Sequence, residues 1–290
     1  MNEQRTVFNC DLCDSSDAIE VPHSREYTKD NVPVHICSNC GLVYTRHRRS
    51  AQAIADSWSN SIYGDGYTAR IPAVRARQQY VADTIDVELG LAGKTLCDIG
   101  GGEGQFLEIA RKEYGALVFA SEASDSNCFH LELAGISHFQ GTIEEFSESE
   151  ASQNRCFDLA TIMWTLECCQ APQTMIQAAR KVLRPGGHLV VATGSRILVP
   201  FKKPLNQFFS GTRERDTHPL EFSAKTLAGF MNTVGFETTF VNRYLDSDVL
   251  LVIGRRVDEP IEPSYPLDDP NQVANFFERW HQETQYYKDE

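Results

Sequence analysis

Apolar and polar positions along the middle of the chain follow two periods in turn, one typical of buried strands and one typical of helices. Residues 73–89 have helical spacing, with Val74, Val81 and Ile85 on one face. The expected strands are 95–99, 117–120, 138–140, 157–163 and 188–193, and the expected helices among them are 106–114, 126–134 and 172–182. Strands that alternate with helices predict a mostly parallel sheet covered on both faces.

The pattern changes after residue 222. Ser223 is a suitable N-cap for a helix over 224–234, which Gly235 would end. Two β runs, 237–244 and 249–253, follow with only four residues between them. So short a connection joins antiparallel neighbours. The expected fold class is α/β: a Rossmann-like, doubly wound, mostly parallel seven-stranded sheet closed by an antiparallel hairpin.

A glycine-rich loop follows the first expected strand. Asp98 ends that strand, and Gly100, Gly102 and Gly104 lie just after it. Glycines let a backbone approach a ligand closely. Glu122 follows the next expected strand, 24 residues after Asp98, and a carboxylate there can accept hydrogen bonds from ligand hydroxyls. The loop alone fits many nucleotide ligands, but the loop together with this acid is a more specific signal.

Two cysteine pairs stand near the start of the chain. Cys10-x-x-Cys13 and Cys37-x-x-Cys40 are separated by 23 residues, and two such pairs can complete a tetrahedral zinc site. Four thiolates leave no open position, which favours structural zinc in a small N-terminal zinc-binding domain. This segment has few large apolar residues, so metal would supply stability that its core lacks. Four unrelated free cysteines are the alternative.

Composition and charge limit the partners. The formal net charge of -13 argues against a nucleic-acid partner held by phosphate contacts. No apolar run has the length of a membrane span, and the first residues lack a signal-peptide layout. We therefore expect no membrane partner and a cytoplasmic location, where cysteines stay reduced. The expected domains are 1–60 (zinc-binding), 61–256 (the main sheet) and 257–290 (a Pro- and Asp-rich linker, then a helix over 271–287).

Several motifs resemble those of one enzyme family. Residues 98–104, DIGGGEG, resemble the DxGxGxG motif of class I S-adenosylmethionine-dependent methyltransferases, and 183–189, LRPGGHL, resembles their LkPGG turn. Residues 37–45, CSNCGLVYT, and 218–223, HPLEFS, are similar to zinc-ribbon methyltransferases of bacterial sugar and surface-glycan pathways. The resemblance spans roughly 8–254. It departs from the family after Glu167, where Cys168 replaces a frequent histidine.

This resemblance implies a cofactor and a metal. The cofactor is S-adenosylmethionine, and its expected contacts are Asp98, Gly100, Gly102, Gly104, Glu122, Thr142, Ile143 and Trp164. The metal is structural Zn²⁺, with Cys10, Cys13, Cys37 and Cys40 as ligands.

The acceptor and the base are predicted from residue chemistry. Methyl transfer needs an aligned acceptor and can need a base. His218 is the first candidate for the base, and Glu167 and Asp216 are the next. Tyr67 and Trp164 would line the binding site. Residues 196–215 carry five cations, Arg196, Lys202, Lys203, Arg213 and Arg215, against one acid, Glu214.

This basic segment predicts an anionic small-molecule acceptor, such as a nucleotide-linked sugar, contacted by Lys203 and Arg213. Arg46, His47, Arg48 and Arg49 would add to its pocket. The alternatives are an rRNA methyltransferase with a zinc module and a non-catalytic interaction protein of zinc-ribbon and Rossmann type. The sequence does not decide the oligomeric state.

Overall fold

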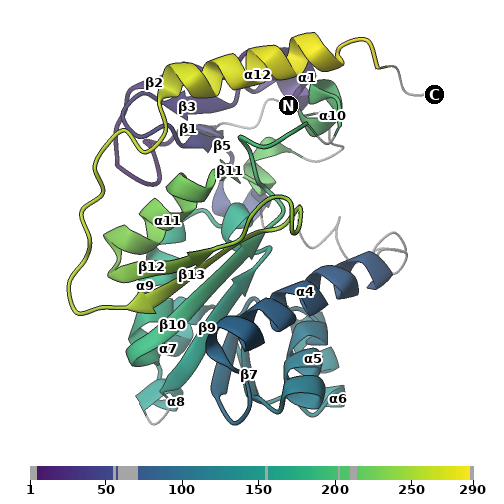
Figure 1. The fold of residues 1–290 in the computed structure, drawn as a ribbon, viewed down its shortest axis with the longest axis vertical. Helices are drawn as coiled ribbons and strands as arrows, with labels where there is room; N and C mark the ends of the chain where they lie inside the picture. Colours follow the sequence, from purple (N-terminus) through teal and green to yellow (C-terminus); the bar gives the residue numbers. More distant parts are fainter. Residues whose placement is uncertain are drawn as a thin grey trace.

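The computed structural model describes residues 5–54, 57, 71–153, 156–201, 203–209 and 214–287. A seven-stranded sheet is its centre (Figure 1). The strands in sheet order are β12 (Phe236–Val241), β13 (Leu250–Arg256), β10 (Leu183–Thr193), β9 (Phe157–Met163), β6 (Thr95–Ile99), β7 (Leu117–Glu122) and β8 (His138–Gln140).

The strand directions confirm the expected fold class. From β8 to β10 all neighbours are parallel, and β13 is antiparallel to both β10 and β12. The connection between β12 and β13 is longer than expected, because β12 ends at Val241 and β13 begins at Leu250. The predicted turn at 184–187 lies inside β10, which begins at Leu183 and shifts register before His188.

Helices cover both faces of this sheet. They are α4 (Ile71–Leu89), α5 (Gln105–Tyr114), α6 (Asp125–Leu133), α7 (Ile143–Glu148), α8 (Glu150–Gln153), α9 (Pro172–Val182) and α11 (Ala224–Thr233). Figure 1 shows α4 and α5 on one face and α7, α9 and α11 on the other. Ile85 and Leu107 are fully buried in the first core, and Phe146, Ile176 and Phe230 in the second. The sheet therefore separates two apolar layers.

The N-terminal segment forms two small antiparallel sheets. One pairs β1 (Thr6–Val7) with β5 (His47–Arg48), and the other has the order β11 (Leu220–Glu221), β4 (Val43–Tyr44), β3 (His35–Cys37) and β2 (Ala18–Glu20). Short helical turns connect or flank these strands: α1 (Ser24–Tyr27), η1 (Lys29–Asn31), η2 (Leu166–Cys168), α10 (Leu205–Phe209) and η3 (Arg215–Thr217). Because β11 comes from the distant part of the chain, the small sheet is not built by residues 1–60 alone.

The last helix, α12 (Pro270–Thr284), covers this N-terminal sheet (Figure 1). Asp269 caps it by accepting a hydrogen bond from the Asn271 amide at 2.8 Å. Its apolar stripe, Val273, Phe277 and Trp280, belongs to one buried cluster with Val34, Ile36 and Val43. The expectation that the N-terminal segment lacks a core holds only for the segment by itself, since α12 and α10 supply the missing apolar surface.

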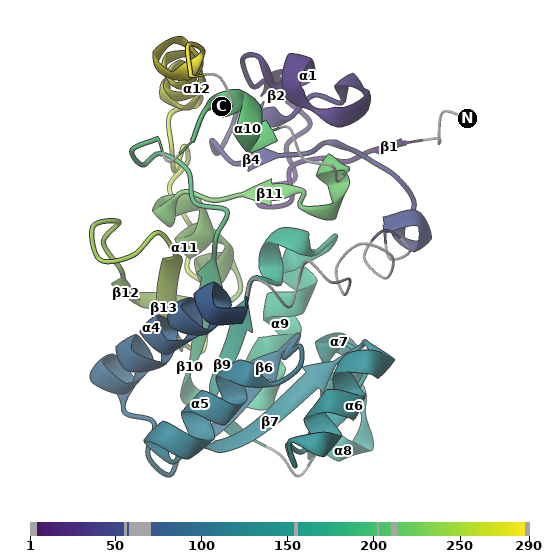
Figure 2. The ribbon, with the colours of Figure 1, turned by 90° about the vertical axis from the view of Figure 1, so that its right-hand side faces the viewer.

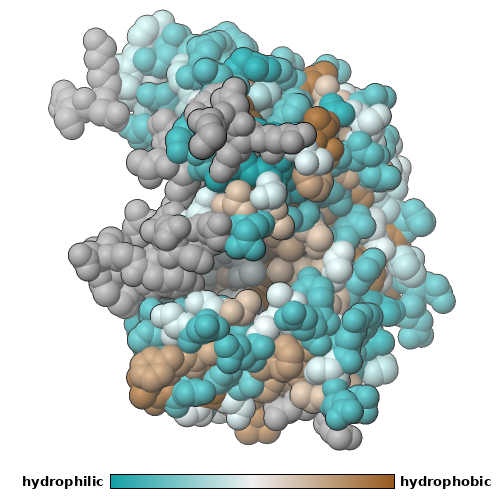
Figure 3. All heavy atoms as spheres, turned by 180° about the vertical axis from the view of Figure 1, so that it is seen from behind, coloured by the Kyte–Doolittle hydropathy of each residue, from teal (hydrophilic) through white to brown (hydrophobic). Residues whose placement is uncertain are grey.

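The face of the molecule seen from behind (Figure 3) is mostly polar. Figure 3 shows a largely hydrophilic face on which hydrophobic residues form small separate groups. No helix in the described part of the chain is both long and apolar enough to cross a membrane.

Candidate functional site

The glycine-rich loop joins β6 to α5 at the carboxyl edge of the sheet. Gly100 and Gly104 have φ of +70° and +87°, a conformation that residues with a side chain rarely adopt. A Cβ on Gly100 would lie 2.8 Å from the Thr165 side chain, and a Cβ on Gly104 would lie 2.7 Å from Leu131. The path of the loop therefore requires glycine for two reasons, conformation and space.

Glu122 holds this loop in place. Its two carboxylate oxygens accept hydrogen bonds at 2.8 Å from the backbone amides of Gly102 and Ser124. The side chain is 8% exposed and still lines the adjoining cavity. The acid that the spacing singled out thus connects the end of β7 to the loop and remains in reach of a ligand.

Asp98 lies beneath the loop and is 2% exposed. Burial raises its pKa to about 7, a hydrogen bond from the Thr161 hydroxyl at 2.6 Å opposes the rise, and the nearby Glu122 carboxylate adds to it. Among the described residues that line the cavity with Asp98, the one cation is Arg77, and it forms its ion pair with Asp248. A cationic ligand would therefore favour its ionised form.

A cavity of about 400 Å³ opens at this edge of the sheet. It brings together the predicted residues Asp98, Gly100, Gly102, Glu122 and Trp164. It is also lined by residues that the sequence did not single out: Val74, Arg77, Gln78, Gly101, Gln105, Asn127, Met163, Thr165 and Cys168. One signal was available. Gln78 lies on the stripe of Val74, Val81 and Ile85, where a polar residue interrupts an otherwise apolar helix face.

Three predicted cofactor contacts do not line the cavity. Gly104 caps α5, and Ile143 is 1% exposed in the core. Thr142 caps α7, where its hydroxyl and the Glu145 carboxylate form a capping box. These positions have structural explanations, and their cofactor contacts stay predictions.

Trp164 follows β9 with a strained backbone. Its φ of +54° is left-handed, which is uncommon for a large side chain and typical of functional sites. The Trp164 amide donates to the Ala192 carbonyl at 2.8 Å. A Cβ on Gly194 would lie 3.7 Å from the indole ring. Trp164 therefore lines the first cavity and lies beside Gly194, which lines a second one.

The second cavity, of about 210 Å³, lies between the sheet and α12. Its lining consists of Arg77, Gly194, Arg196, Val199, Pro200, Lys203, Phe208, Asp248, Phe276 and Trp280. Arg77 lines both cavities and forms an ion pair with Asp248 at 2.9 Å. Lys203 and Arg196 add positive charge, while Phe276 and Trp280 of α12 provide an aromatic wall.

The predicted bases lie outside both linings. His218 is half-buried, and its Nδ1 lies 3.3 Å from the Thr217 hydroxyl. Glu167 is 3% exposed; burial raises its pKa to about 7, and hydrogen bonds from Thr193 and the Gly194 amide oppose the rise. Asp216 is fully buried and binds Arg49 at 2.8 Å. The assignment of His218 or Glu167 as base stays a prediction.

The two cysteines after Glu167 differ in position. Cys168 lines the larger cavity. Burial raises the pKa of the Cys169 thiol to about 12, so this thiol stays protonated at neutral pH and is a poor nucleophile.

Part of the predicted basic surface is neutralised. Arg215 donates to Glu221 at 2.6 Å, Arg49 is paired with Asp216, and the buried Arg48 forms an ion pair with Asp11. Arg48, Arg49 and Arg215 therefore do not add unpaired positive charge, because folding pairs them with carboxylates. The other predicted substrate contacts, Tyr67 and Arg213, and the cation Lys202 lie outside the described residues.

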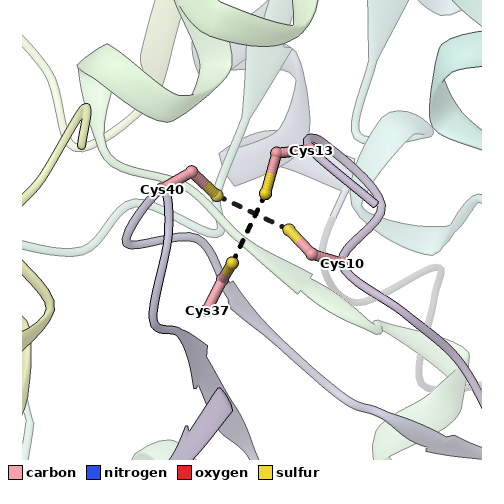
Figure 4. A group of neighbouring side chains, drawn as sticks. All are labelled: Cys10, Cys13, Cys37 and Cys40. Carbon is pink, nitrogen blue, oxygen red and sulfur yellow. Dashed lines mark hydrogen bonds between the residues drawn. The ribbon is translucent and has the colours of Figure 1, made fainter. Parts of the chain in front are cut away.

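The four N-terminal cysteines converge on one point (Figure 4). The Sγ atoms of Cys10 and Cys40 are 3.5 Å apart, as are those of Cys13 and Cys37, and all four lie within 4.8 Å of one another. A tetrahedral site with Zn–S bonds of about 2.3 Å places its sulfurs roughly 3.8 Å apart. The arrangement fits a zinc ion with four thiolate ligands.

The raised pKa of Asp98 predicts a pH-dependent stability. The native state keeps the Asp98 proton up to about pH 7, whereas the unfolded chain releases it near pH 4. Stability from this group is therefore present below pH 4 and is lost as the pH rises through 7, with a slope of up to about 1.4 kcal/mol per pH unit. Denaturant titrations between pH 5 and 8 should show a smaller decline for Asp98→Asn. Equal slopes would contradict the raised pKa.

Comparison with known proteins places the chain. A family described as "Methyltransferase domain" matches residues 73–240, more than half of the sequence. The chain belongs to this methyltransferase family. This confirms the expected methyltransferase family.

Individual relatives cover smaller parts. The ubiquinone biosynthesis O-methyltransferase of Acinetobacter baylyi is 31% identical over 113 residues, 37% of this chain and 46% of the relative. The enzyme of the same name from Vibrio atlanticus is 32% identical over 126 residues, 41% and 50% of the two chains. The chain thus spans about half the length of the curated relatives it matches.

Solved structures share the fold at low identity. The 1,6-didemethyltoxoflavin-N1-methyltransferase of Burkholderia thailandensis has a TM-score of 0.54 with 18% identity, over 75% of this chain and 95% of the other. A SAM-dependent methyltransferase of Thermotoga maritima has a TM-score of 0.50 with 18% identity, over 70% and 100%. These matches support the class I methyltransferase fold.

Proposed function

We propose that the protein transfers a methyl group from S-adenosylmethionine to a small anionic acceptor, a sugar, nucleotide-linked sugar or glycan-pathway metabolite. The observation that carries this proposal is the pair of adjoining cavities. One contains the glycine-rich loop and Glu122, and the other has cationic and aromatic walls. Arg77 lines both, and Trp164 of the first cavity lies beside Gly194 of the second. A donor and an acceptor can therefore meet at Trp164.

The larger cavity suits the cofactor. S-adenosylmethionine supplies a methyl group on a cationic sulfonium. Glu122 would accept hydrogen bonds from the ribose hydroxyls, and Asp98 would favour the positive charge of the amino-acid part. Gly100 and Gly102 leave the loop backbone open to close approach. The Burkholderia structure of the same fold holds S-adenosylhomocysteine, which supports this assignment.

The smaller cavity suits the acceptor. A volume of about 210 Å³ equals the space of roughly seven water molecules, enough for the sugar ring and one acidic group of the acceptor, so that the nucleotide of a nucleotide-linked sugar would extend out of the cavity. Lys203 and Arg196 would pair with that acidic group, and Phe208 and Phe276 would contact the ring. Holding the ring beside Trp164 would align it for an in-line displacement.

An activity screen tests this function. We expect calorimetry to show micromolar binding of S-adenosylmethionine, and S-adenosylhomocysteine to form in the presence of a sugar phosphate or nucleotide-linked sugar. The matched neutral sugars are the control and should react far more slowly. Failure to bind the cofactor would support the non-catalytic interaction protein instead, and turnover of neutral acceptors alone would refute the anionic class.

Lys203 should affect the acceptor and not the cofactor. We expect Lys203→Ala to raise the acceptor KM about tenfold, because it removes a charge-assisted contact, while the cofactor Kd stays unchanged. Its backbone carbonyl still accepts from the Trp280 indole at 2.7 Å, so the helix contact is kept. Lys112→Ala removes an exposed lysine of α5 that pairs with Glu108 and is the control. An unchanged KM for Lys203→Ala would contradict the proposed pocket.

We also propose that Cys10, Cys13, Cys37 and Cys40 bind structural Zn²⁺, since their sulfur geometry fits a closed site. We also propose three domains, 1–60, 61–256 and 257–290. We propose a cytoplasmic location, where thiols stay reduced. The contributions of β11 and α12 to the N-terminal sheet indicate that the three parts fold together.

A further inference from the structure

Gln78 has an unusual position for a polar side chain. It lies on α4, on the helix face of Val81 and Ile85, and is 8% exposed. It lines the larger cavity together with Asp98 and Gly100. A glutamine inside an apolar helix face is unfavourable unless its amide group is used.

No described residue satisfies this amide oxygen. The Oε1 atom of Gln78 is buried and has no hydrogen-bond partner in the described part of the chain. The next residue, Gln79, contrasts with it, because its amide nitrogen donates to Tyr114 at 2.8 Å and to Asp83 at 3.2 Å. Buried polar atoms in folded proteins nearly always have a partner. The unpaired oxygen therefore points to a hydrogen-bond donor on a ligand.

The anchors of α4 identify the end of the cavity where this ligand group lies. Arg77 pairs with Asp248, and Tyr80 accepts a hydrogen bond from Asn242 at 3.1 Å; both partners lie between β12 and β13. Glu122 lies on β7, and β6, β9 and β10 separate β7 from β13 in the sheet. Figure 2 shows α4 near β12 and β13, away from α6. Gln78 is therefore at the end opposite to Glu122.

We propose that Gln78 binds the α-ammonium group of S-adenosylmethionine as a hydrogen-bond acceptor. This rests on the proposed function, in which Glu122 holds the ribose, so that the amino-acid part extends toward α4. A primary ammonium has three N–H donors, and Asp98 lines the same cavity as a second acceptor. The guanidinium of Arg77 forms an ion pair with Asp248 at 2.9 Å, and no hydrogen bond joins it to the Gln78 amide oxygen, which has no partner among the described residues.

Calorimetry on matched variants tests the contact. The variants are Gln78→Met, which keeps the shape and removes the amide, and Gln79→Met as the control on the same helix. The ligands are S-adenosylmethionine, decarboxylated S-adenosylmethionine, which keeps the ammonium, and 5′-methylthioadenosine, which lacks the amino-acid part. We expect Gln78→Met to weaken binding of the first two about tenfold and of the third less than twofold. Gln79→Met should leave all three unchanged.

Other outcomes would overturn the assignment. Equal losses for all three ligands would indicate a general change of the cavity, and a loss confined to S-adenosylmethionine would mean that the amide contacts the carboxylate. Unchanged binding of every ligand would refute any contact. Without ligand, Gln78→Met should melt at the same or a higher temperature than the parent protein, because the substitution removes a buried, unpaired amide oxygen from an apolar helix face. If the parent protein fails to bind S-adenosylmethionine, the proposed function itself is wrong.

Discussion

Cys37→Ser is expected to lower the melting temperature strongly and to abolish binding of one zinc ion per chain. Structural zinc in small domains contributes apparent binding energies of about 10–16 kcal/mol, and Cys37 ends β3, beside the buried Ile36. The loss of order should extend to α12, because Asp268, just before that helix, is packed against the second cysteine pair. Its amide donates to the Cys40 carbonyl at 3.3 Å, and a Cβ on Gly41 would lie 2.3 Å from its carbonyl oxygen.

Cys37→Ser should affect ligand binding in the smaller cavity more than in the larger one. Phe276 and Trp280 of α12 line the smaller cavity, whereas α4, β6 and β7 line the larger one. We therefore expect acceptor binding to be lost while the cofactor Kd changes less than about threefold. Elemental analysis, thermal unfolding and calorimetry provide the measurements. Cys156→Ser, at an exposed cysteine outside the cluster, is the control. Full metal content and normal melting in Cys37→Ser would contradict a four-thiolate site.

Gly100→Ala is expected to weaken cofactor binding at least 100-fold, a loss of about 2.8 kcal/mol. The new Cβ would meet the Thr165 side chain at 2.8 Å and would strain a backbone with φ of +70°. The loop must then move where it lines the cavity with Asp98. Because the clash involves a side chain at the edge of the sheet, the stability loss should stay at about 1–3 kcal/mol.

Gly93→Ala separates backbone strain from loss of the site. Gly93 has nearly the same φ, +72°, but a Cβ there meets no atom within 4 Å and Gly93 does not line the cavity. We expect a similar or smaller loss of stability and an unchanged cofactor Kd, measured by denaturant titration and calorimetry. If both variants weaken cofactor binding equally, the effect of Gly100 is not local to the loop.

Local periodicity explains why much of the fold could be predicted. The strand at 138–140 and the helix at 172–182 have the expected bounds, because each is defined by neighbouring residues. The bounds of β10 and β12 differed where register and twist depend on partner strands. The docking of α12 on Val34 and Ile36 joins residues more than 200 positions apart, and no local pattern encodes such a contact.

For the candidate site too, local motifs could be predicted from the sequence, whereas contacts that depend on folding could not. Spacing alone located the cysteine cluster, because each CxxC pair is a local motif. The glycine-rich loop was identified from its own residues, and Glu122 from the acid that the resembling family has after its second strand. Thr142 was placed by resemblance, and in this chain it caps a helix at a distance from the cavity lining. Arg215 was counted as a free charge, but folding pairs it with Glu221. Charge counts from a sequence do not show which side chains neutralise each other.

The pairing of β11 with β4 also sets an order of events during synthesis. Tyr44 pairs with Leu220, so the small sheet beside the metal ligands cannot be completed until the ribosome has added residue 220. At translation rates of about 5–20 residues per second, this delay is on the order of ten to forty seconds. During that time the thiols at 10–40 lack the cover that the later chain provides in the folded protein.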